Sequence, residues 1–127
     1  MITFSRFAEG IAAPSIVPLA GPIDREHLAR MTLGERSLER EVLELFDRQS
    51  DMLFARMCKY TPDVAAAAAH TLKGSARGIG AWRVAGTAEA VELAATGTAI
   101  EFKAALGALK IAVDETKTAI AELLRAN

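Results

Sequence analysis

An apolar repeat of three to four residues runs through this chain from Pro22 almost to its C-terminus, and it limits the possible folds more than any other feature. Such spacing places apolar side chains on one face of an α-helix, whereas a half-buried strand alternates at every second residue. No convincing alternation of that kind occurs. Short stretches with Gly, Pro or Thr interrupt the repeat. It predicts helices over residues 23–31, 35–59, 62–77, 81–96 and 99–125.

Four of these helices are long, carry an apolar stripe and are joined by short connections. Short connections make neighbouring helices antiparallel, and four such stripes are buried best against one another. We therefore predict an all-α fold, an up-down-up-down antiparallel four-helix bundle with a short additional N-terminal helix over one end. In the helix over residues 35–59, the predicted buried stripe consists of Leu38, Val42, Leu45, Phe46, Met52, Leu53 and Met57.

The first 22 residues differ in composition from the rest and contain three of the four prolines. Proline removes a backbone donor and disfavours helix in the residue before it. We predict an irregular proline-containing arm over residues 1–22, followed by one helical domain over residues 23–127, a size that one hydrophobic core can support. The sequence leaves open whether apolar residues of the arm occupy a groove on the domain or the arm simply frays.

Charge and cysteine content exclude several functional classes. Fifteen basic and sixteen acidic residues give a net charge of −1, which argues against non-specific nucleic-acid binding. No apolar run approaches the roughly 18 residues of a membrane span, and Glu9 interrupts the stretch that a signal peptide would keep apolar. The single cysteine, Cys58, fits a reducing compartment and is predicted to be a buried free thiol. We expect a cytoplasmic monomer with no nucleic-acid or membrane partner and no cofactor of its own.

The stretch "AAAAAHTLKGSARGIGAW", residues 65–82, combines a strong helix former with a helix-weakening glycine. Glycine inside a helix costs about 1 kcal/mol relative to alanine, so something should compensate for Gly74. With Leu72 at the centre of the buried face, His70 lies about 160° away, on the solvent side. Ala66 and Gly74 lie one turn to either side of it. The sequence therefore predicts an uncrowded imidazole on the helix surface.

Two cations share this face of the helix, Lys73 and Arg77. A neutral imidazole, with an ordinary pKa near 6.5, can act as a nucleophile, and nearby cations stabilise a transferred phosphoryl group. A lone surface histidine usually has no such role, but this combination favours one. We predict that His70 accepts phosphate, that Lys73, Gly74 and Arg77 serve phosphoryl or partner binding, and that no metal binds. Because no glycine-rich phosphate loop is present, the chain would be a phosphoryl carrier without its own ATP site rather than a kinase.

The second histidine, His27, lies among long charged side chains in "DREHLAR". We interpret it as an ordinary surface residue. With Asp24 it could form one weak metal-binding pair, but a metal site needs three or four ligands.

The segment "HTLKGSARGIGA", residues 70–81, resembles the phosphorylation motif of histidine phosphotransfer (HPt) domains, and the likeness extends over about residues 22–125. The resemblance implies that His70 exchanges phosphate with the aspartate of a receiver domain, in a hybrid sensor kinase and in a response regulator. Magnesium would belong to the receiver, Lys73 would help to hold the phosphoryl group, and Gly74 would leave room for the receiver. Arg77 departs from the family by placing a large cation where many relatives have a smaller residue. The matching positions are His70, Leu72, Lys73, Gly74 and Gly80.

The leading hypothesis is thus a histidine phosphotransfer protein that relays a phosphoryl group between receiver aspartates through His70. Two alternatives remain open: a non-catalytic helical adaptor that binds a receiver, and the phosphorylatable domain of a chemotaxis-type kinase. Hydrolase and metalloenzyme functions are disfavoured because no carboxylate pair or second nucleophile–base set stands out. We also expect an exposed apolar patch near His70, partly supplied by the helix over residues 35–59.

Overall fold

Every regular element is an α-helix in the computed structural model, which describes residues 21–126. The all-α prediction is therefore confirmed for this part of the chain, whereas residues 1–20 of the predicted arm lie outside the described residues. None of these helices combines the length and the apolar character that a membrane span requires. The helices are α2 (Arg25–Met31), α3 (Arg36–Lys59), α4 (Pro62–Ile79), α5 (Trp82–Ala94) and α6 (Ala99–Ala126).

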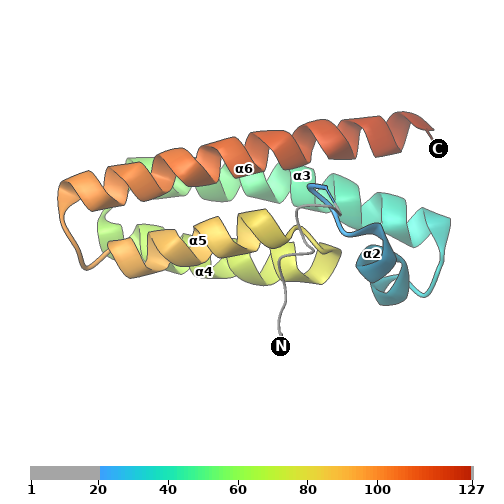
Figure 1. Ribbon diagram of the computed structural model, residues 1–127, viewed down its shortest axis with the longest axis horizontal. Helices are drawn as coiled ribbons and strands as arrows, with labels where there is room; N and C mark the ends of the chain where they lie inside the picture. Colours follow the sequence, from blue (N-terminus) through green and yellow to red (C-terminus); the bar gives the residue numbers. More distant parts are fainter. Residues whose placement is uncertain (1–20, 127) are drawn as a thin grey trace, which may run out of the picture.

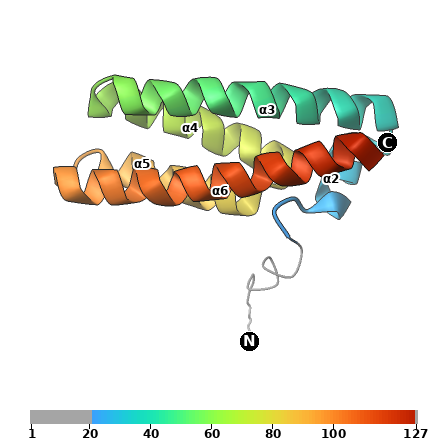
Figure 2. The same ribbon diagram turned by 90° about the horizontal axis from the view of Figure 1, so that it is seen from above.

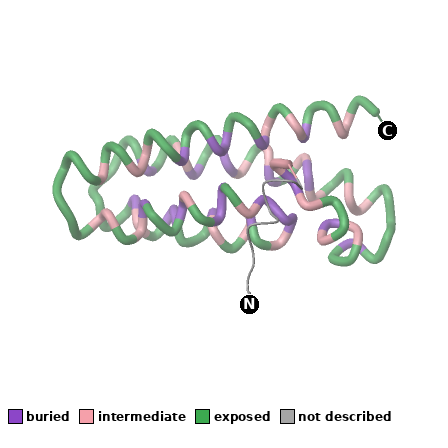
Figure 3. The backbone as a smooth tube through the Cα atoms, in the orientation of Figure 1, coloured by how far each residue is buried: buried purple, intermediate pink, exposed green. Residues whose placement is uncertain are grey.

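The four long helices lie side by side along the long axis of the molecule, and α2 lies at one end (Figure 1). In the view from above, α3 and α6 lie nearer the viewer, and α4 and α5 lie behind them (Figure 2). Helix α4 packs between α3 and α5 and also contacts α2. Buried residues follow the sides on which the helices face one another, so α4 keeps one outer face in contact with solvent (Figure 3).

Helix α4 ends two residues later than its predicted limit, at a left-handed glycine. Gly80 has φ +81°, and the next amide, that of Ala81, donates to the Ala76 carbonyl at 2.9 Å. Gly78, two residues before it, remains helical. At Gly80 an added Cβ would lie 2.9 Å from the Asp24 carbonyl oxygen. The segment before α2 therefore packs directly on the turn that joins α4 to α5.

Small side chains line the contact between α4 and α5. Because alanine adds only one methyl group, helices that meet through alanines can approach closely. Side chains of moderate length on α5 can then reach the outer face of α4. The largest fully buried side chains come from all five helices, with Phe46 of α3 and Leu72 of α4 among them. The buried alanines of the two helices are Ala65, Ala68, Ala69 and Ala76 of α4 and Ala85 and Ala88 of α5.

Three predictions about burial on α3 are wrong. Leu45 and Met52 are exposed, although both were predicted in the buried stripe, and Cys58 is exposed rather than buried. The buried stripe of α3 is centred on Phe46 and Leu53, and a rotation of about 100° per residue carries the residue just before each of them away from the core. Apolar spacing alone did not reveal this offset.

Candidate functional site

His70 points outward from the middle of α4, with 70% of its side chain exposed. The residues around it on the helix are small: Ala67 and Gly74 are exposed, and Ala66 is half-buried. The outward direction agrees with the sequence prediction. The helix therefore presents an imidazole that a large molecule can approach.

The imidazole is held from the neighbouring helix by a residue that the local sequence pattern did not predict. Nδ1 of His70 lies 2.8 Å from Oε2 of Glu92, near the C-terminal end of α5. A signal for this contact does exist in the sequence. The turn at Gly80 reverses the chain, and His70 and Glu92 lie at similar distances on either side of it, so a helical hairpin brings them together.

Lys73 completes the group by binding the other oxygen of the same carboxylate. Its Nζ lies 2.7 Å from Oε1 of Glu92, and only 14% of its side chain is exposed. Its ammonium is thus paired with Glu92. We call these three residues the His70–Glu92–Lys73 cluster. In it, one partly buried carboxylate joins an exposed ring to a largely buried cation.

The charge of Glu92 determines which ring nitrogen of His70 is available. The Lys73 ammonium and the His70 ring hold the pKa of Glu92 below its ordinary value, although partial burial acts in the opposite direction. Glu92 is therefore ionised at neutral pH and can only accept hydrogen bonds. We assign the ring proton of neutral His70 to Nδ1, where it donates to Glu92. The lone pair then lies on Nε2.

Acid should weaken this cluster. Because the folded pKa of Glu92 lies below the unfolded value, its contribution to stability is present at neutral pH and is lost as pH falls through the folded pKa. Urea unfolding should show Glu92→Gln less stable than wild type at pH 7, by up to about 1 kcal/mol, with the gap closing under acid. Glu89→Gln, which removes a looser 3.9 Å pair with Arg77, is the control. A gap that stays constant down to pH 3 would contradict the assigned role of the Glu92 charge.

Arg77 lies two turns beyond His70 and makes other contacts. Its guanidinium lies 3.9 Å from Glu89 on α5, and both side chains are exposed. Its carbonyl oxygen lies 2.8 Å from Nε2 of His27. The structure thus joins His70 and Lys73 through Glu92 but directs Arg77 to a different partner. A role for Arg77 in phosphoryl or partner binding stays a prediction.

The fold itself does not require the glycine beside His70. A Cβ added to Gly74 would meet nothing within 4 Å, and its φ lies outside the left-handed range. No internal contact compensates for the weak helix propensity of this residue. The space above Gly74 therefore lies on the outside of the molecule, where another molecule can use it.

Gly74→Ala should make the protein more stable. An alanine at this exposed helical position should add about 1 kcal/mol to the free energy of unfolding, because it restores helix propensity without a clash. Gly107→Ala in α6 is the matched control, since a Cβ there also meets nothing within 4 Å. Urea or thermal unfolding would measure both. Loss of stability in the Gly74 variant alone would show that the fold needs this glycine.

His27 is a structural residue rather than a plain surface one, which corrects the sequence interpretation. Besides its bond to the Arg77 carbonyl, its ring lies against Trp82, with 4.8 Å between the ring centroids. Asp24 accepts from the His27 amide and from Nε1 of Trp82. These contacts tie α2 to the α4–α5 turn. Over residues 21–126, no three His, Cys, Asp or Glu side chains gather closely enough to hold a metal ion.

Comparison with known proteins adds one finding to this geometry. A family model described as "Hpt domain" matches residues 25–126, which begin with α2 and end with α6. Comparison with curated proteins and with solved structures found no match. Hpt domains act in phosphotransfer in two-component systems and interact with receiver domains. Because the match covers most of the sequence, the chain belongs to the Hpt domain family.

Proposed function

We propose that this protein relays a phosphoryl group between receiver-domain aspartates, with His70 as the residue that carries it. One observation supports this most strongly: an imidazole with 70% exposure has its Nδ1 held 2.8 Å from Glu92, which leaves Nε2 for an incoming phosphoryl group. The proposal takes α3 to α6 as the up-down-up-down four-helix bundle predicted from the sequence, with α2 over one end. It also keeps the predicted cytoplasmic location and monomeric state.

The transfer step needs only groups that the two proteins bring. The Nε2 lone pair of His70 attacks the phosphorus of the receiver's aspartyl phosphate, and an N–P bond forms. The bond between phosphorus and the aspartate oxygen breaks, and the carboxylate leaves with the electron pair. The Nδ1 proton stays on the ring, where the positive charge of the phosphorylated imidazole faces the Glu92 carboxylate. Attack by a second receiver's aspartate reverses these changes and returns neutral His70.

Lys73 is suited to stabilise the phosphoryl group once it has arrived. It lies one helical turn from His70, and its ammonium is already oriented by Glu92 at 2.7 Å. Negative charge on the phosphoryl oxygens would draw this ammonium partly away from Glu92, and a preoriented cation needs little reorganisation. Arg77, farther along the helix and bound to Glu89, would serve contact with the partner. Magnesium, as the family resemblance implies, would be supplied by the receiver.

The surface beside His70 offers a partner an apolar contact area. Leu45 and Met52 of α3, which the sequence predicted to be buried, are exposed and would supply part of the apolar patch that the sequence predicts near His70. Exposed apolar groups next to a reactive residue are typical of protein contact surfaces. We call this surface the α3–α4 face. It consists of Leu45, Gln49, Met52 and Arg56 of α3 and Val64, Ala67 and Thr71 of α4.

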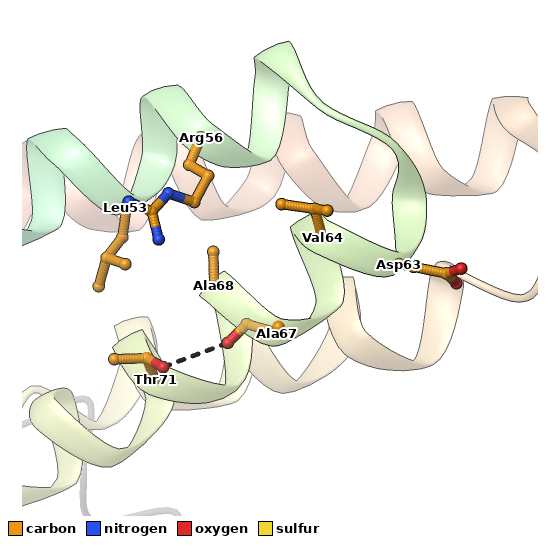
Figure 4. Close-up of a pocket in the computed structure, with 7 residues that line it drawn as sticks. All are labelled: Leu53, Arg56, Asp63, Val64, Ala67, Ala68 and Thr71. Carbon is orange, nitrogen blue, oxygen red and sulfur yellow. Dashed lines mark hydrogen bonds between the residues drawn. The ribbon is translucent and has the colours of Figure 1, made fainter.

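A cavity of about 320 Å³ lies in the α3–α4 face (Figure 4). Arg56 extends over one side of it from α3, and Val64 and Ala67 line the other side from α4. Thr71, the residue after His70, also lines it and donates to the Ala67 carbonyl at 3.2 Å. A receiver that inserts an apolar side chain here would bring its phosphorylated aspartate over α4, and Arg56 would complement its negative charge.

Phosphoryl transfer from phosphorylated receiver domains tests the proposal. Receiver domains labelled with acetyl phosphate would be mixed with the protein and magnesium, and the label followed over time. We expect it to appear on this chain in a form that is stable to alkali and labile to acid, as phosphohistidine is. Incubation with labelled ATP alone should leave the chain unlabelled. A receiver whose phosphorylated aspartate is replaced by asparagine is the control donor.

The same experiment separates the alternative functions. A chain that binds a receiver but never acquires label would be an adaptor, and the relay proposal would be wrong. A chain that accepts phosphate only from an ATP-bound kinase domain would fit the chemotaxis-kinase alternative. Gly74→Ala should lower the transfer rate from a receiver while Gly107→Ala leaves it unchanged, because only the first methyl lies beside His70.

A further inference from the structure

Leu33, in the turn between α2 and α3, has an unusual backbone and an unusual environment. Its φ is +56°, and it is the one residue other than glycine with a positive φ among the described residues. Bulky side chains rarely adopt this left-handed conformation because Cβ comes too close to the backbone. The side chain is also 85% exposed. A large apolar group is therefore held in a strained conformation without being buried.

The hydrogen bonds around Leu33 show why a left-handed residue is needed there. The Leu33 amide donates to the Arg30 carbonyl at 3.3 Å, and the Gly34 amide donates to the Ala29 carbonyl at 2.9 Å. This pair of bonds is the Schellman ending of a helix, whose left-handed position is usually glycine and sometimes asparagine. The chain instead has leucine at that position and places glycine one residue later. The motif explains the backbone conformation but not the leucine.

Packing within the chain does not explain the leucine either, because most of its side chain is in solvent. Strained residues persist where the surrounding structure holds them, and they concentrate at functional positions. Exposed leucine gains from burial only when another molecule covers it. Gly74 shows the same pattern, since a more stabilising residue would fit there too. Leu33 and Gly74 therefore each lower the stability of the fold, and no contact within the chain offsets that loss.

The position of Leu33 connects it to the α3–α4 face. The adjacent residues Met31 and Thr32 line a cavity of about 220 Å³ together with Val42 and Ile79. Val42 and Ile79 also line the next cavity, of about 160 Å³, which Leu45 and Ser75 continue towards His70. An apolar groove thus runs between α3 and α4 from the α2–α3 turn to the α3–α4 face. Figure 1 shows α2 and this turn at the end of the α3–α4 pair.

One partner domain is large enough to cover both the surface around His70 and the end of the groove near Leu33. His70 and Ile79 are separated by nine helical residues, or about 14 Å along α4. A domain of roughly 100 residues has a radius of gyration of about 13 Å, so its footprint extends this far. A stable contact buries about 800 Å² on each partner and depends on a few well-buried apolar anchors. The small residues around His70 cannot supply such anchors, so they must come from Leu45 and Met52 of the α3–α4 face and from residues farther along the groove.

We propose that Leu33 is a specificity-determining contact for the receiver domain that docks over His70, burying its side chain against an apolar segment of that receiver. This inference rests on the proposed function and assigns a further residue to the same partner. Continuity of the groove with the His70 surface favours the receiver as occupant over a second copy of this chain. A receiver with a charged or shorter segment at this place would be discriminated against.

Leu33→Asn tests the proposal because asparagine tolerates the left-handed conformation but removes the apolar side chain. Relief of strain should raise the melting temperature by about 4 °C. Phosphorylation of His70 by phosphoramidate, a small donor that needs no docking, should match wild type. Phosphoryl transfer from a phosphorylated receiver should become about tenfold less efficient, through a higher KM, because an apolar anchor of the interface is lost. Leu33→Gly should behave in the same way.

Ile111→Asn is the matched control, because Ile111 is also exposed but lies on α6, away from the groove. It should transfer like wild type. Wild-type transfer by both Leu33 variants would overturn this inference and leave the relay intact. A lower melting temperature in both would show that Leu33 stabilises the fold, which also overturns it. A wild-type chain that reacts with phosphoramidate but exchanges with no receiver would overturn the relay itself.

Discussion

Replacing His70 by glutamine should abolish phosphoryl acceptance. The rate of phosphoryl transfer from a phosphorylated receiver should fall by more than about a thousandfold. Glutamine fits the exposed site and can still hydrogen-bond to Glu92, but it has no nucleophilic lone pair like that of Nε2. The fold should survive, because 70% of the His70 side chain is exposed and the lost pair with Glu92 contributes no more than about 1 kcal/mol. Label transfer and thermal unfolding would be measured on the same preparation.

His27→Gln provides the control for His70→Gln, since these are the two histidines of the chain. It removes the bond to the Arg77 carbonyl and the ring contact with Trp82, so it should lower stability. This variant should nevertheless accept the phosphoryl group, because His27 lies on α2 beside the C-terminal end of α4 and not in the His70–Glu92–Lys73 cluster. Acceptance by the His70 variant would refute the assignment of the phosphorylated residue.

Removing the carboxylate of Glu92 should give the second-largest effect on transfer. Glu92→Ala leaves Nδ1 of His70 without its partner at 2.8 Å and leaves the largely buried Lys73 ammonium without its partner at 2.7 Å. The ring can then rotate and carry its proton on either nitrogen. A smaller fraction of the protein therefore has the lone pair on Nε2. We expect transfer to slow by about 100-fold, the lower end of what a positioned acid–base partner contributes.

A positioning role can be separated from a merely structural one by examining the ring directly. Nitrogen-15 NMR of wild type at neutral pH should show the proton on Nδ1, whereas Glu92→Ala should show a mixture of both ring forms. Glu89→Ala is the control: Glu89 also lies on α5 but pairs with Arg77 at 3.9 Å and not with the His70 ring, so the ring form should stay unchanged. A Glu92 variant that transfers at the wild-type rate would remove Glu92 from the mechanism.

Much of the fold was predictable because helical periodicity is a local property. The Gly-containing and Pro-containing breaks between apolar repeats marked all five described helices to within a few residues. Helix ends were less certain, since Gly78 and Gly80 offer the same local signal. Contact with Asp24 distinguishes them, and that contact comes from a segment far away in the sequence. Local pattern therefore predicted the elements but not the exact end of α4.

Burial on α3 and the composition of the site depended on tertiary structure. The spacing of Leu45 and Met52 fits an apolar stripe, yet the core lies at a different angle around α3, so both remain exposed. His70 was predictable because its exposure follows from counting along one helix. Glu92 was not, because its contact requires the close approach of α4 and α5. The hairpin at Gly80 carried that information, but only once its two helices were considered together.

The central claim is that Glu92 holds Nδ1 of His70 and thereby makes Nε2 the phosphorylated atom. The most direct test of this claim is two-dimensional NMR on the protein after phosphoryl transfer from a phosphorylated receiver. The spectra would correlate the ring nitrogens with their carbon-bound protons and with phosphorus. We expect the phosphorus to be bonded to Nε2 of His70. A bond to Nδ1, or to any residue other than His70, would contradict it.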